Sequence, residues 1–285
     1  MHFLTMKFGG TSVADVTRIK AVADIIRSEL KPNRKIIVVV SAMSDQTNKL
    51  IELAKDLGVK GTIDPEYDAL VSTGEDVSAS LLTLALKNKG VRARSWRGWQ
   101  VPINTDSFFS NAKIKSVNTK KLIQSFKDDL EVAVISGFQG VEKDKRITTL
   151  GRGGSDTSAV AIAASIGSER CDIYTDVSGI YTTDPRIKRK AAKIKKISYE
   201  EMLEMASLGA NVLQTRAVEM AMRSKTPIQV LNSFSNEEGT LVCDEEEIME
   251  KNIISGIAFQ RNEARITLSD IEDKPGVASK IFGPL

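Results

Sequence analysis

Short apolar runs alternate with longer stretches of helical periodicity along this 285-residue chain. Residues 35–40 hold five consecutive Ile and Val side chains without polar alternation, which indicates a strand covered on both faces. Similar runs occupy residues 3–8, 132–135, 171–174 and 227–231. Helices are expected from residue 12 and at residues 48–57, 76–88, 119–126, 157–166 and 199–224. Strands that alternate with helices predict an α/β fold, a three-layer sandwich with a mostly parallel central sheet.

Three local signals refine this expectation. Thr11 or Ser12 can cap the first helix, and Ser198 with Glu201 forms a capping box. Gly209 indicates that residues 199–224 form two helices or one kinked helix.

Composition excludes several classes of partner and chemistry. Lys and Arg number 40 against 37 Asp and Glu, and the basic run at 188–190 has no interleaved aromatic residue, so no nucleic-acid partner is expected. His2 is the only histidine, which removes His-based triads and zinc sites. Cys171 and Cys243 stand far apart and are expected to be reduced thiols of a cytoplasmic protein. The apolar run at 36–40 is too short to span a membrane.

Two glycine-rich segments follow expected strands, where ligands of open parallel sheets bind. In M-K-F-G-G-T-S, residues 6–12, Lys7 supplies a positive charge, and Gly9 and Gly10 let phosphate oxygens approach backbone N–H groups. An ordinary strand-to-helix turn would show the same glycines. In L-G-R-G-G-S-D-T, residues 150–157, successive N–H groups can bind an anion and Arg152 can grip a carboxylate. Neither segment is a Walker loop or a dinucleotide fingerprint.

Three further segments admit two interpretations each. Residues 174–186 present acids, hydroxyls and an aromatic ring that suit a nucleotide pocket, or form a turn-rich connection. Glu75, in S-T-G-E, either favours a helix dipole or pairs with a substrate ammonium group. Ser41, in S-A-M-S, either caps a helix or belongs to a ligand site together with Thr47.

Together these segments resemble the amino-acid kinase superfamily, and within it the aspartate kinases. The resemblance rests on K-F-G-G-T-S, V-V-S-A-M-S, S-T-G-E, T-T-L-G-R-G-G-S-D and Y-T-D-V-S-G-I-Y-T-T-D-P-R, in this order and over nearly the whole chain. It implies the amino-acid kinase fold and transfer of the ATP γ-phosphoryl group to the side-chain carboxylate of L-aspartate. The product would be 4-phospho-L-aspartate. Its formation would be the first step toward three end products: threonine, methionine, and lysine, which is made by way of diaminopimelate.

The resemblance also implies roles for individual residues. Lys7 would stabilise the transferring phosphoryl group, and Asp156 would organise the lysine and the substrate. Aspartate would be held by Thr47, Glu75, Arg152, Gly153, Gly154 and Ser155. ATP would be contacted by Lys7, Phe8, Gly9, Gly10, Ser41, Thr175, Asp176, Tyr181, Asp184, Arg186 and Asn211. Mg²⁺ would be bound through the nucleotide phosphates, with no metal site made by the protein itself.

One position departs from the family pattern. Many relatives carry lysine in a G-[AS]-K-[VI]-L segment that touches ATP, and here Asn211 takes its place. The alternatives that stay open are a superfamily member acting on glutamate, a nucleoside monophosphate or carbamate, and a weakened subunit or sensor that binds ATP and an amino acid. The aspartate carboxylate has a pKa of about 3.9, so its phosphorylation needs no general base. A homodimer or higher oligomer is expected.

A change in composition near residue 245, where an acidic stretch begins, predicts a domain boundary. Residues 1–245 are expected to form the catalytic domain, and residues 246–285 a linker followed by the truncated start of an ACT regulatory domain, an ACT-like βα segment. Strand structure is expected within residues 253–271, and a helix opens near residue 274. Because ACT regions pair to bind lysine or threonine, no normal feedback control is expected from this chain alone.

Overall fold

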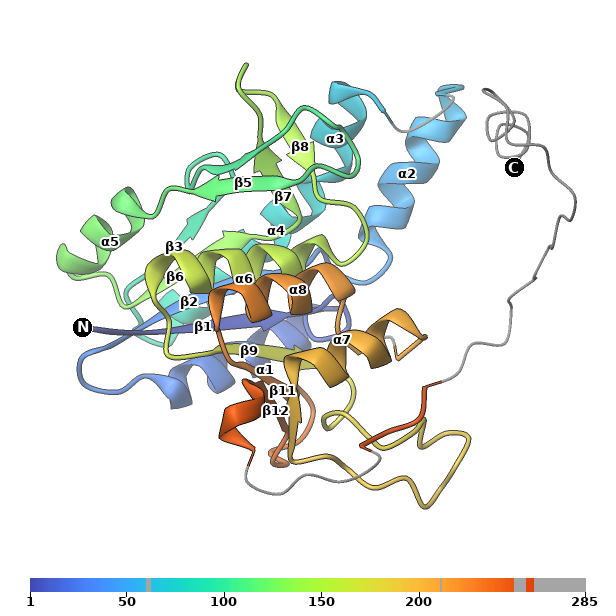
Figure 1. Cartoon of the computed structure of the whole chain (residues 1–285). Coiled ribbons are helices and arrows are strands. Elements are labelled where there is room, and N and C mark those ends of the chain that lie inside the picture. The colour runs from blue at the N-terminus through green and yellow to red at the C-terminus, as the bar shows by residue number, and fades with distance from the viewer. Residues whose placement is uncertain (60–62, 211, 249–254, 259–285) are drawn as a thin grey trace, which may run out of the picture.

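The computed structural model describes residues 1–59, 63–210, 212–248 and 255–258. Its centre is an eight-stranded sheet with the order β10-β12-β11-β9-β1-β2-β6-β3 (Figure 1). The strands are β1 (His2–Phe8), β2 (Arg34–Val40), β3 (Ala93–Trp96), β6 (Val132–Ser136), β9 (Cys171–Thr175), β10 (Lys196–Ser198), β11 (Ile228–Asn232) and β12 (Thr240–Cys243). Neighbouring strands run parallel except β11 and β12, which are antiparallel.

Helices cover both faces of this sheet, and β2 shows how its sequence produces the layers. Ile36, Val38 and Val40 pack in one core with side chains of α1 and α4, whereas Ile37 and Val39 pack on the opposite face with side chains of α5 to α8. Both faces of the strand are therefore buried, as its lack of alternation predicts. The helices are α1 (Val16–Glu29), α4 (Thr73–Asn88), α5 (Lys120–Lys127), α6 (Gly154–Ile166), α7 (Tyr199–Ser207) and α8 (Thr215–Ser224).

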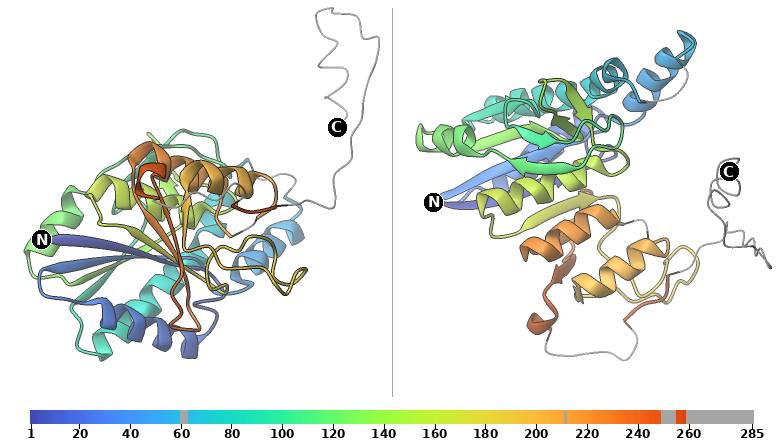
Figure 2. Two further views of the ribbon diagram at one scale, coloured as in Figure 1. Left: turned by 60° about the horizontal axis from the view of Figure 1, so that its bottom comes forward. Right: turned by 45° about the horizontal axis from the view of Figure 1, so that its top comes forward.

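A second, four-stranded sheet with the order β5-β4-β7-β8 lies beside the sandwich (Figure 2). Its strands are β4 (Ile103–Thr105), β5 (Ile114–Val117), β7 (Gln139–Val141) and β8 (Ile147–Thr149). The helices α2 (Gln46–Asp56) and α3 (Pro65–Val71) complete this part, and a short 3₁₀ turn spans Glu245–Glu247. The sheet was not predicted, and its last strand leads directly into the glycine-rich segment at 150–157.

The sequence places most central strands correctly, whereas three predicted helix starts are wrong by three residues or more. The helix expected from residue 76 begins at Thr73. The first helix begins at Val16 and is capped by Asp15, whose side chain accepts a hydrogen bond from Arg18 N, rather than by Thr11 or Ser12. Ser12 is instead buried and donates a hydrogen bond to Ser233 Oγ at 2.8 Å. The helix expected from residue 157 begins at Gly154, so part of the glycine-rich segment is its first turn.

Other local predictions are confirmed. The capping box of Ser198 and Glu201 is present at the start of α7. The stretch around Gly209 forms two helices, α7 and α8, rather than one kinked helix. Of the strand structure expected within 253–271, residues 255–258 form neither helix nor strand, and the other residues of that segment lie outside the described ranges, as does the helix expected near residue 274.

The stretch Pro65–Asn88, which contains α3 and α4, is long and apolar enough to cross a membrane by length and composition. Half of its most apolar window is buried inside the protein. The α4 side chains Leu82 and Leu86 lie in the core between the sheet and α1. This burial is that of a core helix in a globular fold.

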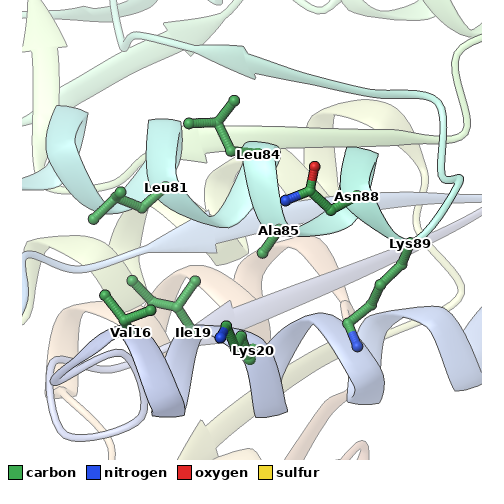
Figure 3. Close-up of a pocket in the computed structure, with 8 residues that line it drawn as sticks. All are labelled: Val16, Ile19, Lys20, Leu81, Leu84, Ala85, Asn88 and Lys89. Carbon is green, nitrogen blue, oxygen red and sulfur yellow. The ribbon is translucent and has the colours of Figure 1, made fainter.

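A shallow apolar groove of about 390 Å³ lies between α1 and α4 (Figure 3). Val16 and Leu84 at its edges are 55% and 58% exposed, and Lys20 and Lys89 also line it. No residue of the groove belongs to the segments from which the sequence predicts chemistry.

Candidate active site

Lys7 lies at the carboxyl end of β1, the strand flanked by β2 and β9. Its side chain is 11% exposed, and Nζ lies 2.6 Å from Asp156 Oδ1. Asp156 belongs to the first turn of α6. This ion pair therefore joins the two glycine-rich segments that the sequence singles out, although they are far apart along the chain.

The loop after β2 packs against the glycines that follow Lys7. Ser41 N donates a hydrogen bond to Phe8 O at 3.0 Å, and Ser44 Oγ donates to Gly10 O at 3.2 Å. A Cβ at Gly10 would come within 3.0 Å of Ala42 O, so only glycine leaves this approach unstrained. The structure thus brings the first predicted phosphate-binding segment and S-A-M-S together.

Glu75 lies in the first turn of α4 and is 4% exposed. One carboxylate oxygen, Oε1, accepts a hydrogen bond from Ala42 N at 3.1 Å, and the other, Oε2, is buried without a hydrogen-bond partner among the described residues. Burial raises the pKa of Glu75 to about 8. A buried, unpaired oxygen of this kind provides a place for an added hydrogen-bond donor such as an ammonium group. Thr47, in the first turn of α2, is half-buried.

Behind Glu75, a polar network that the sequence did not reveal holds the start of α4. Asp76 Oδ1 accepts hydrogen bonds from Ser136 Oγ at 2.7 Å and from Gln139 Nε2 at 3.0 Å. Gln139 Nε2 also donates to Ser72 O at 2.8 Å. An acid in a first helical turn looks like a simple dipole partner, so only its contacts identify this role.

The second glycine-rich segment forms the turn between β8 and α6. Gly151 and Gly153 have φ values of 74° and 68°, in the left-handed region that glycine adopts readily. Gly154 N and Asp156 N donate to Gly151 O and Gly153 O within the turn. The remaining N–H groups at the start of α6 and the exposed guanidinium of Arg152 supply donors for an anion. No ion pair of Arg152 occurs among the described residues. A Cβ at Gly137 would come within 2.8 Å of Ser155 Oγ, so the end of β6 lies close against this turn.

Replacing Gly153 with alanine is expected to lower the free energy of unfolding by about 1–3 kcal/mol. A residue with a Cβ is strained in the left-handed conformation, and this strain destabilises the folded protein. An added Cβ would also lie 1.8 Å from Gln214 Cγ. Gly167→Ala is the matched control, because Gly167 has a φ of 70° and no atom within 4 Å of an added Cβ. Urea denaturation of both variants tests this, and equal losses would show that the contact with Gln214 has no effect.

Five of the residues predicted to contact the nucleotide line one cavity of about 640 Å³, whereas Lys7, Phe8, Gly9, Gly10 and Ser41 are not among its lining residues. Among its lining residues are Thr175, Asp176, Tyr181, Asp184 and Arg186. Within this group Arg186 binds Asp184, Nη2 to Oδ2, at 2.8 Å, and its hydrogen bonds lower the pKa of that carboxyl. Asn211 lies outside the described residues.

The cavity has a wall that the sequence did not predict. Ile257 and Ala258 line it, and Ile257 N donates a hydrogen bond to Thr182 O at 2.7 Å. A Cβ at Gly256 would come within 2.9 Å of Met205 Sδ on α7. These residues follow the boundary expected at 245, yet they pack against the sandwich.

Comparison with known proteins agrees with this geometry. A family model described as the amino acid kinase family matches residues 3–232. The chain belongs to this family. Over its full length it is 50% identical to an aspartate kinase of Pseudomonas putida, of which it spans 69%, and over 99% of its length it is 44% identical to an aspartokinase of Helicobacter pylori, of which it spans 70%. Within the amino acid kinases the chain thus groups with the aspartate kinases.

Solved structures give the same assignment. Aspartokinase III of E. coli, in complex with aspartate and ADP, aligns with a TM-score of 0.76 at 30% identity, over 85% of this chain and 65% of that chain. Aspartate kinase from Synechocystis aligns with a TM-score of 0.74 at 43% identity, over 85% of this chain and 40% of that chain. The uridylate kinase of Archaeoglobus fulgidus, at 20% identity and a TM-score of 0.60, shares the fold alone. The three-layer amino-acid kinase fold predicted from the sequence is confirmed.

Proposed function

We propose that this chain transfers the γ-phosphoryl group of ATP to the side-chain carboxylate of L-aspartate. The observation that carries the proposal is the strand order β9-β1-β2. It puts the nucleotide cavity, which follows β9, on one side of Lys7, and the buried carboxylate of Glu75, which contacts the loop after β2, on the other. This order supports a role for Lys7 between a site for the donor and a site for the acceptor.

In this proposal each group has a role that its surroundings support. Glu75 Oε2 accepts a hydrogen bond from the ammonium group of aspartate, and Arg152 with the N–H groups of Gly153 and Ser155 binds a carboxylate, while Gly154 N donates to Gly151 O and shapes the turn. Lys7 neutralises negative charge that develops on the phosphoryl oxygens, and Asp156 holds the Lys7 side chain in place. The acceptor carboxylate is already ionised at neutral pH, so positioning and electrostatics suffice for the reaction.

The described residues contain no group of three or more His, Cys, Asp or Glu side chains that could hold a metal ion. We propose that Mg²⁺ enters with ATP and is bound through its phosphate oxygens, an arrangement typical of nucleotide sites. When bound, the ion neutralises phosphate charge. No protein side chain is assigned to it.

A steady-state assay with ATP, Mg²⁺ and each acceptor tests the proposal. We expect ADP release that depends on aspartate, together with an acyl phosphate that hydroxylamine traps as a hydroxamate. Glutamate, nucleoside monophosphates and carbamate serve as competing acceptors. Nucleotide binding without release of ADP in the presence of aspartate would refute the proposal and favour a binding subunit or sensor.

Ile257→Ala tests the wall that residues 255–258 add to the nucleotide cavity. Because the side chain is 63% exposed, its truncation removes only part of the contact area, and we expect the KM for ATP to rise about 3- to 10-fold. The KM for aspartate is expected to stay unchanged. Ile187→Ala, at a similarly exposed isoleucine that does not line the cavity, is the matched control. An unchanged KM for ATP would remove Ile257 from the site.

A further inference from the structure

The turn that carries Arg152 is held from one side by a buried carboxylate on α3. Asp68 is fully buried and accepts a hydrogen bond from Thr149 N at 2.6 Å. It also accepts hydrogen bonds from Ser110 N at 2.9 and 3.0 Å and from Ser110 Oγ at 3.0 Å. Asp68 thus binds the last residue of β8 and the neighbouring loop at once. A carboxylate suits this place because it only accepts hydrogen bonds and faces several donors.

From the other side the same turn is held by Arg216 on α8. One guanidinium nitrogen, Nη1, donates to Leu150 O at 2.6 Å and to Asn111 Oδ1 at 3.0 Å. The other, Nη2, donates to Ala112 O at 2.8 Å. The planar guanidinium holds these acceptors in a fixed geometry. Arg216 therefore fastens residues 111–112 to the residue that precedes Gly151.

The two segments that Asp68 and Arg216 hold, residues 149–151 and 110–112, also contact each other directly. Ala112 N donates a hydrogen bond to Thr149 O at 2.9 Å. Ser110 has a φ of 66°, unusual for a residue other than glycine, and its N–H points to Asp68. A Cβ at Gly151 would lie 2.8 Å from Asn111 Oδ1. The turn is thus fixed through its backbone, while the Arg152 side chain is exposed.

Asp68 has a further connection that gives these contacts a functional meaning. It lies on α3, and the C-cap residue of α3 is Ser72. Ser72 is also the N-cap residue of α4, the helix that carries Glu75. The hydrogen bond that Asp68 accepts from Thr149 N therefore links the helical segment of Glu75 to the turn of Arg152. These are the two groups assigned to the ammonium and carboxylate groups of the acceptor.

We propose that Asp68 and Arg216 are positioning residues that set the spacing between Glu75 and Arg152, and thereby the length of amino acid that the acceptor site takes. This inference rests on the proposed function. Neither side chain is assigned a contact with substrate. Both act on the backbone of the turn that offers Arg152 and the N–H groups of α6.

The test measures kinetics and calorimetric aspartate binding for Asp68→Asn and Arg216→Lys. Asp68→Asn replaces one carboxylate oxygen with an NH₂ group, which cannot accept hydrogen bonds from the N–H and O–H groups that face it. Arg216→Lys removes the planar guanidinium that contacts three acceptors at once. For both we expect kcat/KM for aspartate to fall about 10- to 100-fold, as misplaced substrate groups cause. The KM for ATP is expected to stay within about twofold, since the donor cavity keeps its residues. The preference for aspartate over glutamate is expected to weaken.

Asp24→Asn and Arg92→Lys, in exposed ion pairs, are the matched controls and should leave all constants unchanged.

Asn111→Ala keeps the test decisive if either variant fails to fold, because Asn111 is exposed and its loss leaves Arg216 two carbonyl acceptors. We expect a smaller rise in the KM for aspartate, and less than additive effects when it is combined with Arg216→Lys. Lower melting temperatures with unchanged aspartate binding and unchanged acceptor preference would overturn the inference. If the wild-type protein neither binds nor phosphorylates aspartate, the proposed function itself fails, and this inference fails with it.

Discussion

Replacing Lys7 with alanine is expected to lower kcat by about 10²- to 10³-fold, the loss typical when one preorganised charge is removed from a transition state. Lys7 Nζ is held by Asp156 at 2.6 Å in a largely buried site, so its charge acts there with little screening by water. A coupled assay for ADP release gives kcat directly.

Loss of stability has to be separated from loss of chemistry in this variant. Lys7→Ala leaves the buried carboxylate of Asp156 without its partner, and a cost of about 3–5 kcal/mol is expected, with the protein still folded. The double variant Lys7→Ala with Asp156→Ala removes the unpaired charge and should regain stability but not turnover. Lys35→Ala, on the neighbouring strand β2, loses only a hydrogen bond to Leu130 O and is the control. Near-normal kcat in Lys7→Ala would refute the role of this lysine.

The sequence predicted the parts of the fold that are specified locally. Strands β2 and β6 are largely apolar and buried on both faces, and β1, β9 and β11 contain shorter apolar runs, so local composition identifies all five. The second sheet was missed because its strands are three or four residues long, as in Ile103–Thr105, and its two antiparallel strand pairs are joined only by the pairing of Asn104 with the distant Val141. Short strands of this kind carry too few side chains for a periodic pattern to show.

The candidate site divides in the same way. The glycine-rich segments stood out because glycine, charge and strand ends coincide in a few neighbouring residues, and Glu75 because an acid follows Ser72, Thr73 and Gly74 at the start of an expected helix. Asp68 and Arg216 did not, since their partners lie far along the chain; Asp68 and Thr149, for example, are 81 positions apart. A buried carboxylate within an apolar helix becomes informative only when the donors around it are known.

Glu75→Gln is expected to raise the KM for aspartate about 100-fold, because the ammonium group would lose a buried counter-charge. Glutamine keeps the size of the side chain and the acceptor for Ala42 N, so the loop after β2 should stay in place. The KM for ATP is expected to change little. Steady-state kinetics with each substrate varied in turn measures this, and an unchanged KM for aspartate would exclude Glu75 from the acceptor site.

The pKa of Glu75, raised to about 8 by burial, predicts how this interaction depends on pH. Below pH 8 the free carboxyl group is mostly protonated, and binding of an ammonium group favours its ionised form. Aspartate binding should therefore release a proton at neutral pH, and affinity should increase as the pH rises toward 8. Calorimetry in buffers with different ionisation enthalpies detects the proton. The same measurements on Glu75→Gln should show neither effect.

Stability provides an independent measurement of the same group. The folded protein keeps a proton on Glu75 that the unfolded chain loses above its ordinary pKa of 4.5, so the contribution of Glu75 to stability falls as the pH rises from 4.5 to about 8 and is constant above it. Glutamine does not ionise, so Glu75→Gln should gain in melting temperature relative to the wild-type protein over that interval. Asp68 and Asp172 also have raised pKa values, but they are present in both the wild-type protein and the Glu75→Gln variant. The difference between the two curves of melting temperature against pH therefore isolates Glu75. Parallel curves would mean that Glu75 is ionised in the unliganded protein, and the predicted proton release would then be absent as well.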